Sequence, residues 1–190
     1  METAIIITTV LLILFSILAV YDGFYLHIFK YRLQDHPESR TEHLTHTLRA
    51  VFFPAILYFL FLKQDCQISF IIGLVVFTAD LLVLGIDAYI EKDSRKFMGG
   101  LPRWEYILHL FVNGFHFASI AVVLSLKLKY GNDGIIIMPS ITEYQNYVLF
   151  HTVAINLLPG AIMIGMLHTL LCFSKTRLYW NNIRNTIKCC

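Results

Sequence analysis

The sequence predicts an all-α integral membrane protein, and three observations lead to this fold class. Of the 190 residues, 57% are hydrophobic and 15% are charged, and the mean hydropathy is +0.64. A soluble domain of this length could not bury so much apolar surface, so a bilayer has to cover it. The apolar residues also fall into long runs, and the basic residues gather between particular runs. We therefore expect a single transmembrane domain that comprises residues 1–190.

Five transmembrane helices are predicted from the apolar runs, because a hydrocarbon core about 30 Å thick requires about 20 helical residues. The first run lacks the basic start and the cleavage site of a signal peptide, so we interpret it as a retained helix. The second run is the least regular, because Pro54 interrupts it. The expected spans lie near residues 4–28, 44–62, 67–91, 104–126 and 147–173.

The positions of the basic residues predict the orientation. They concentrate after the first, third and fifth spans, and positively charged loops mark the cytoplasmic side. We therefore expect the N-terminus outside and the C-terminus in the cytoplasm. A net charge of +2 with no basic patch gives no support to nucleic-acid binding, so the expected partners are membrane lipids and an apolar small molecule. The basic residues concerned are Lys30, Arg32, Arg40, Lys92, Arg95, Lys96, Arg103, Lys175, Arg177, Arg184 and Lys188.

Ionisable residues inside the spans are the informative exceptions, because they are costly in lipid and usually face the interior of a bundle. On a helix with 100° per residue, the polar residues of span three lie within about 20° of one direction, and those of span four within about 40°. Span two carries a third polar face. The three stripes are Glu42, His46 and Arg49; Asp80, Asp87 and Glu91; and Glu105, His109 and His116.

Two pairs of ionisable residues inside the spans have a spacing that bears on whether they meet. Asp80 and His116 each lie about 16 Å from the cytoplasmic end of their helix, so we expect them to be partners. Asp22 and His27 in span one are five residues apart, and an unbroken α-helix would point them about 140° from each other. Either Gly23 loosens this turn, or only one of the two side chains faces inward.

A short pattern occurs twice, as E-H-L-T-H in residues 42–46 and as E-Y-I-L-H in residues 105–109. Each copy follows an acidic residue at the end of the preceding span, Asp22 in one case and Asp87 in the other. This repeat predicts two similar helical hairpins that form a four-helix bundle, with a fifth helix beside it. Such a bundle would bring carboxylates and imidazoles to one level near the cytoplasmic face.

Carboxylates together with imidazoles are typical of a metal centre. The arrangement resembles in architecture the ferritin-like di-iron bundles, where the Glu-to-His spacing is one residue shorter. We expect a membrane-embedded metalloenzyme, most simply one that oxidises a lipid, quinone or other apolar substrate with two iron ions; zinc, which would favour hydrolysis, and manganese are alternatives. The expected ligands are Glu42, His46, Asp87, Glu91, Glu105 and His109, with Asp22, His27, His43, Arg49, Asp80 and His116 as supporting residues or alternative ligands.

Other interpretations of these residues stay open at this point. A b-type haem cytochrome would use paired histidines as axial ligands, from among His46, His109, His116 and His168. A transporter of metal cations or protons would use the same acidic and histidine residues as a path. In structural terms, Ser39 and Glu42 fit a helix capping box, and Glu105 fits the first turn of a helix. The adjacent Cys189 and Cys190 are expected to be unmodified, with S-acylation as the alternative.

Overall fold

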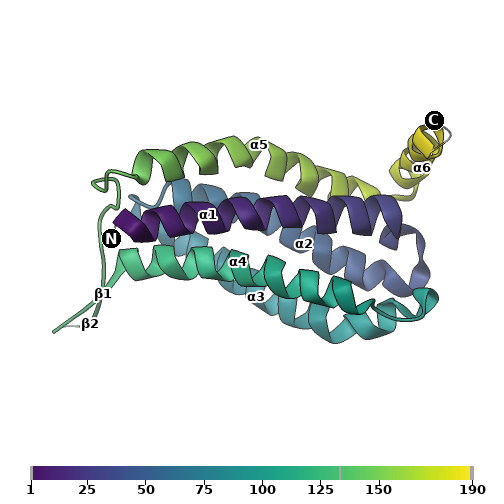
Figure 1. Cartoon of the computed structure of the whole chain (residues 1–190), viewed down its shortest axis with the longest axis horizontal. Coiled ribbons are helices and arrows are strands. Elements are labelled where there is room, and N and C mark those ends of the chain that lie inside the picture. Colours follow the sequence, from purple (N-terminus) through teal and green to yellow (C-terminus); the bar gives the residue numbers. More distant parts are fainter. Residues whose placement is uncertain (1, 133, 189–190) are drawn as a thin grey trace.

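The computed structural model describes residues 2–132 and 134–188, and the chain is mostly helical. Five long helical segments run side by side along the molecule, and a short sixth helix lies at one end (Figure 1). They are α1 (Glu2–Ala19) with a π-helical continuation (Val20–Lys30), α2 (Arg40–Ile56) with a π-helical continuation (Leu57–Leu62), α3 (Gln67–Ser94), α4 (Arg103–Lys127), α5 (Tyr147–Leu171) and α6 (Ser174–Lys188).

The five predicted spans are confirmed as helices. In the part of the chain that the structure describes, five helices are long and apolar enough to cross a membrane, and their bounds lie within a few residues of the expected ones, except that the second begins earlier. Pro54 lies inside α2, and the π-helical stretch begins three residues later. Proline lacks the N–H that an α-helix needs at this position, and such interruptions are often accommodated by local departures from α-helical geometry.

The packing order of the helices differs from the one that the internal repeat suggests. α1 packs mainly against α4 and α5, whereas α2 packs mainly against α3 and α5. The Lys63–Cys66 turn is short enough to hold α2 and α3 together, but the loop after α1 contains two 3-10 turns, Leu33–Asp35 and Pro37–Ser39. This loop lets α1 and α2 separate. The close pairs are therefore α1 with α4 and α2 with α3.

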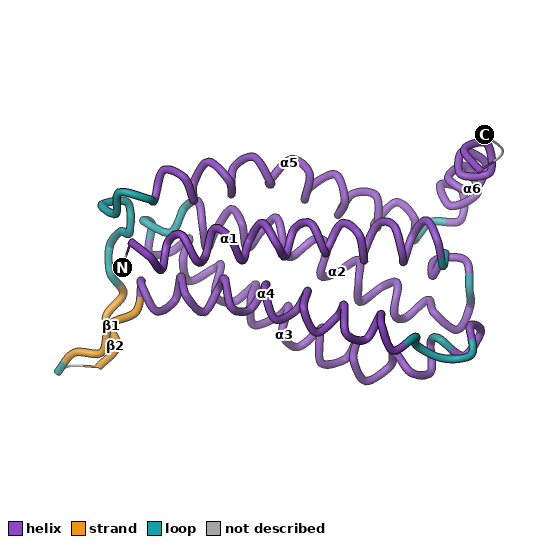
Figure 2. Tube along the Cα trace, in the orientation of Figure 1, coloured by secondary structure: helices purple, strands orange, loops and turns teal. Residues whose placement is uncertain are grey.

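The two ends of the bundle differ in character. The end that carries the start of α1 also carries an antiparallel hairpin of β1 (Leu128–Gly131) and β2 (Gly134–Ile137), as Figure 2 shows. These two short strands were not predicted from the sequence. The interior at this end is apolar, with buried side chains from all five long helical segments, among them Leu12, Leu60, Phe70, Ile120 and Phe150.

α6 lies across the opposite end of the bundle (Figure 1). It is tied to the loop after α1, because Arg177 Nη1 donates to the carbonyl oxygen of Gln34 at 2.6 Å. Arg184 Nε donates to the carbonyl oxygen of Phe29, also at 2.6 Å. These contacts fix α6 beside the polar end of the bundle. The cysteine pair 189–190 lies outside the described residues.

Gly165 of α5 permits a close approach to α2, and its replacement tests this packing. A Cβ at this position would lie 2.8 Å from the carbonyl oxygen of Ala50, which is backbone and cannot move aside. We expect Gly165→Val to lower the melting temperature in detergent, because overpacking costs about 1–3 kcal/mol. Gly85→Val on α3 is the matched control, since nothing lies within 4 Å of its Cβ position. Equal melting temperatures for the two variants would refute a close α2–α5 contact.

Candidate metal centre

Buried acidic and histidine side chains gather at the end of the bundle that carries α6. Two sets of them have ligand atoms within 4.8 Å of one another, as a metal ion would require. The first set comes from the continuation of α1 and from α4, and the second adds residues of α2. His27 belongs to both, and its side chain is fully buried. The first set is Asp22, His27, Glu105 and His109; the second is His27, Glu42 and His46.

The π-helical segment after α1 explains why Asp22 and His27 meet. In a π-helix the hydrogen bonds join residues five apart, so residues five apart lie on the same face. His27 Nε2 is 3.3 Å from Asp22 Oδ1. Both side chains therefore face inward, which answers the question that an α-helical reading of this span leaves open.

His109 links three helical segments through its two ring nitrogens. Its Nε2 lies 3.1 Å from Asp22 Oδ1, and its Nδ1 lies 2.6 Å from Glu91 Oε1. Asp22 is thus in contact with the imidazoles of both His27 and His109. Of the expected ligands, Glu91 supports an imidazole here and is not part of either set.

His46 belongs to the second set and lies beside carboxylates of α2 and α3. Its Nε2 lies 3.5 Å from Asp87 Oδ2 and 3.7 Å from Glu42 Oε1, and neither of these contacts is a hydrogen bond. Asp87 is itself held by Thr45, whose Oγ1 donates to Asp87 Oδ1 at 2.5 Å. The rings of His46 and His27 are 4.2 Å apart. Asp87 therefore supports the site from α3 without belonging to either set.

Arg95, at the end of α3, lies at the centre of the site and was not predicted there. Its side chain is fully buried, and its Nη2 lies 2.7 Å from Glu42 Oε1 and 3.0 Å from Glu105 Oε1. The same nitrogen lies 3.0 Å from His27 Nε2. Sequence reasoning counted Arg95 only as a cytoplasmic charge. A usable signal existed, because Arg95 follows Glu91 by four residues and so continues the polar stripe of α3.

Two smaller contacts complete the surroundings of Arg95. Ser94 donates a hydrogen bond to the carboxylate of Glu42, and the Arg95 guanidinium lies 5.4 Å from the centre of the Tyr31 ring. Burial, and then the negative charge of Glu105, raises the pKa of Tyr31 above its ordinary value. The phenol of Tyr31 therefore remains protonated beside the site.

The capping-box interpretation of Glu42 is wrong. No side-chain hydrogen bond caps α2, and Ser39 Oγ donates to the carbonyl oxygen of Leu33 at 2.7 Å. The carboxylate of Glu42 instead accepts a hydrogen bond from Arg95, whose Nε donates to Glu42 Oε1 at 2.9 Å. Glu105 does lie in the first turn of α4, as expected, and this helix begins directly after Pro102.

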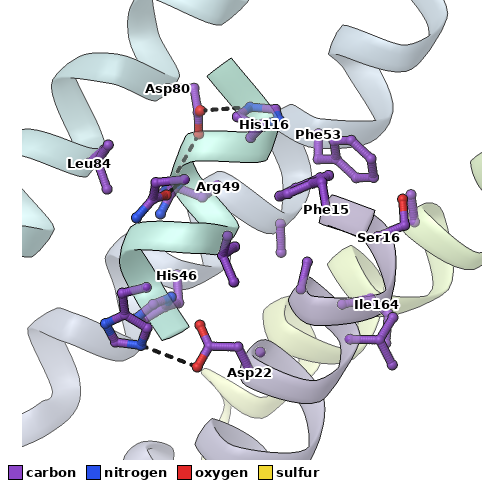
Figure 3. Close-up of a pocket in the computed structure, with 18 of the residues that line it drawn as sticks. Phe15, Ser16, Asp22, His46, Arg49, Phe53, Asp80, Leu84, His116 and Ile164 are labelled. Atoms are coloured by element: carbon purple, nitrogen blue, oxygen red, sulfur yellow. Dashed lines mark hydrogen bonds and ion pairs between the residues drawn. The ribbon is translucent and has the colours of Figure 1, made fainter. Parts of the chain in front are cut away.

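A second polar cluster lies further along the bundle, in its middle. His116 Nε2 is 3.2 Å from Asp80 Oδ2, which confirms the expected pairing. Arg49 Nε donates to Asp80 Oδ1 at 3.2 Å, and Arg49 Nη2 donates to Asn113 Oδ1 at 2.7 Å. Figure 3 shows Arg49 between Asp80 and the side chains of His46 and Asp22. These residues extend the polar interior beyond the two candidate metal-binding sets.

His43 does not join the candidate metal site. It stacks on His168 of α5, with the ring centres 5.6 Å apart, and neither ring nitrogen of His43 makes a hydrogen bond among the described residues. The four histidines considered for haem ligation are spread over three environments: His46 and His109 in the candidate metal site, His116 with Asp80, and His168 with His43.

Several buried polar atoms at the site lack the hydrogen bonds that burial normally requires. Among the described residues, Nε2 of His46 and Nδ1 of His27 make no hydrogen bond. Glu105 Oε1 is paired with Arg95 Nη2 at 3.0 Å, whereas Glu105 Oε2 makes no hydrogen bond. Leaving such atoms unsatisfied is costly, so they suit a ligand that supplies the missing interactions. A divalent cation is one such ligand, since carboxylate oxygens and neutral imidazole nitrogens are its usual donors.

The comparisons with known proteins leave the site to be interpreted from its geometry. The chain matches no protein-family model, and it is significantly similar neither to a curated protein sequence nor to a solved structure. Buried Asp, Glu and His residues that can hold a metal ion are the functional feature that the structure supports.

Proposed function

We propose that the chain is a multi-pass integral membrane protein with its N-terminus outside and its C-terminus in the cytoplasm. Large apolar side chains are exposed along all five long helices, and a bilayer would cover them. The two loops at the α6 end, together with α6 itself, carry most of the basic residues, which agrees with a cytoplasmic location of that end.

We propose further that the protein is a metal-dependent enzyme that acts on an apolar substrate. The observation that carries this proposal is a buried set of two carboxylates and two imidazoles beside an apolar cavity. Asp22 and His109 belong to the set and also line the cavity, whose volume is about 590 Å³. Volumes of roughly 300–1,000 Å³ are usual for small-molecule sites. A bound ion and an apolar molecule would therefore be adjacent.

The residues fit one ion per chain better than two. A metal in the first set would have Asp22, His27, Glu105 and His109 as ligands. In the second set, Nη2 and Nε of Arg95 lie 2.7 and 2.9 Å from Glu42, the one carboxylate of that set, and already balance its charge. In the first set Arg95 lies 3.0 Å from Glu105 and from His27, but Asp22 adds a second carboxylate whose contacts are with His27 and His109. A second divalent ion would thus have no further carboxylate to offset its repulsion by Arg95. We therefore replace the expected two-metal centre by a single ion with Arg95 as a fixed neighbouring charge.

The donor set favours iron and oxidation. Two histidines with carboxylate are the donors of non-haem iron oxygenases, and the iron would supply oxygen activation; zinc in the same place would activate water for hydrolysis. The chain's own residues orient and support the donors. Glu91 fixes the ring of His109, and Arg95 balances the charges of Glu42 and Glu105. Such supporting contacts normally tune metal affinity about 10- to 100-fold.

The haem and transport alternatives gain no comparable support. The rings of His27 and His46 are 4.2 Å apart, a spacing that holds no macrocycle, and the other candidate histidines are engaged with separate partners. A continuous path would have to continue beyond the Asp80–His116 pair. That half of the bundle is filled by the buried apolar cluster that includes Leu12, Phe70 and Ile120.

The test is elemental analysis with optical spectroscopy on protein purified without a metal-chelating tag. We expect about one iron or zinc per chain, and no Soret band. If iron is present, reductant and a membrane lipid extract should start oxygen uptake that the apoprotein does not show. A protein that retains no transition metal and takes up none from micromolar ferrous or zinc salts would overturn the proposal.

A further inference from the structure

The cavity beside the candidate metal site has apolar walls on several sides. Its lining includes Phe15 of α1, Phe53 of α2, Leu110 of α4, and Leu157 and Ile164 of α5. At the α6 end the lining changes to acidic and imidazole side chains, among which are Asp22, His46 and His109. A bound molecule would therefore have most of its surface against hydrocarbon side chains, with one region beside polar groups.

The α3 and α4 side of the cavity is lined partly by exposed residues, which we interpret as an opening to the surface of the bundle. Tyr106 and Leu110 of α4 line it and are 55% and 57% exposed, and Ala88 of α3 lines it and is also exposed. α3 and α4 are not a closely packed pair but meet through side chains such as Glu91 with His109. In a membrane this opening would face the lipid, so a molecule could enter laterally from the bilayer.

Arg49 gives the cavity one strong hydrogen-bond donor group. Its Nε and Nη2 donate to Asp80 and Asn113, and Figure 3 shows its side chain reaching into the space that Asp22 also faces. A guanidinium has five N–H groups, and Nη1 of Arg49 makes no hydrogen bond among the described residues. Because Arg49 lines the cavity, a donor is available to an acceptor atom inside it.

The charge around Arg49 selects an uncharged acceptor. The carboxylate of Asp80 lies 3.2 Å from Arg49 Nε and so balances the guanidinium. Its other oxygen lies 3.2 Å from His116 Nε2. A carboxylate head group beside Arg49 would place a second negative charge next to Asp80, which already balances this guanidinium, and that is unfavourable. A carbonyl oxygen accepts the hydrogen bond without that penalty.

We propose that the cavity binds an uncharged single-chain lipid whose carbonyl oxygen accepts a hydrogen bond from Arg49. Asp22 and His109 of the first candidate metal-binding set line the same cavity as Arg49. The carbon atoms next to the carbonyl would then lie near the candidate metal donors, with the chain along the apolar walls. This inference names a substrate class for the proposed enzyme and rests on that proposed function.

The binding test uses tritiated 2-hexadecanone with the protein in nanodiscs, with empty nanodiscs as background. Palmitate and hexadecane, each with 16 carbon atoms like the ketone, are added as competitors. We expect saturable binding of about one ketone per chain, at least tenfold weaker competition by palmitate, and none by hexadecane. Palmitate binding tighter than the ketone, or ketone binding no greater than that of empty nanodiscs, would overturn the inference.

Two variants connect the binding to this cavity. Arg49→Met should weaken ketone binding at least tenfold, with Arg49→Lys intermediate. Gly114→Phe should abolish binding by filling the cavity, because Gly114 lines it and has open space at its Cβ position. Gly85→Phe is the control, since this exposed glycine has equal space and does not line the cavity. Wild-type ketone binding by Gly114→Phe would place the ligand elsewhere.

Metal content measured on the same samples separates this inference from the proposed function. Arg49→Met and Gly114→Phe should retain the metal while losing the ketone. Metal-free wild-type protein that still binds the ketone through Arg49 would contradict the metalloenzyme proposal and leave the lipid site standing. Metal-loaded wild-type protein that does not bind the ketone would contradict the lipid site and leave the metalloenzyme proposal standing.

Discussion

Asp22→Asn is expected to lose the metal ion while keeping the fold. Asp22 Oδ1 lies 3.3 Å from His27 and 3.1 Å from His109, so this one carboxylate touches both imidazoles of the proposed metal site. Asparagine keeps the size of the side chain but removes the negative charge that a cation requires. Because the loss of a supporting residue alone costs about 10- to 100-fold in metal affinity, we expect a loss of more than about 100-fold here. Titration of the apoprotein with ferrous or zinc ions measures it.

Asp35→Asn is the matched control for this experiment. Asp35 lies in the loop after α1, where Arg32 pairs with it at 2.6 Å, and it belongs to neither candidate metal-binding set. This control should bind the metal as the wild type does, with an unchanged circular dichroism spectrum for both variants. Wild-type affinity in Asp22→Asn would show that the metal, if bound, lies elsewhere.

Arg95→Met is expected to destabilise the protein strongly and to change its metal stoichiometry. The substitution leaves Glu42 and Glu105 buried without their shared cation, whose Nη2 lies within 3.0 Å of both. Removing one partner of a buried ion pair typically costs about 3–5 kcal/mol. The freed carboxylate of Glu42 could then bind a second divalent ion together with His46. Metal salts should therefore partly restore the lost stability, and the bound ratio should rise from about one ion per chain to two.

Two neighbouring substitutions make this result interpretable. Arg95→Lys keeps the charge but not the forked geometry, so its melting temperature should fall between those of wild type and Arg95→Met. Lys96→Met removes an exposed cation one residue away, whose ion pair is with the exposed Asp93, and should leave the melting temperature unchanged. Wild-type stability of Arg95→Met, or one ion per chain in both proteins, would contradict the role assigned to Arg95.

The sequence predicts the helices and the composition of the candidate site well, for a simple physical reason. Long apolar runs have few alternatives to membrane-crossing helices, and charged residues within them must face protein. Of the predicted stripe, Asp80 and Asp87 are buried and Glu91 contacts His109, and Asp80 does pair with His116. These relations follow from helical spacing on single elements and from depth along the bundle.

The arrangement between elements was less predictable. Asp22 and His27 meet because the helix changes to π-helical spacing, and no local sequence signal separated that outcome from an α-helix. The choice of α4 as the close neighbour of α1 depends on loop paths and side-chain packing. Arg95 was missed because a basic residue at a helix end is usually solvated, whereas this one is fully buried between two glutamates. Its burial makes one ion the better expectation.

X-ray absorption spectroscopy at the edge of the bound metal identifies the donors and counts the ions of the proposed centre. For the wild-type protein we expect a single ion with nitrogen and oxygen donors only, including two imidazoles, and with no neighbouring metal in the spectrum. In Arg95→Met a metal–metal distance should appear. A wild-type spectrum with sulfur donors, with the four pyrrole nitrogens of a haem, or with fewer than two imidazoles would contradict a centre built from Asp22, His27, Glu105 and His109.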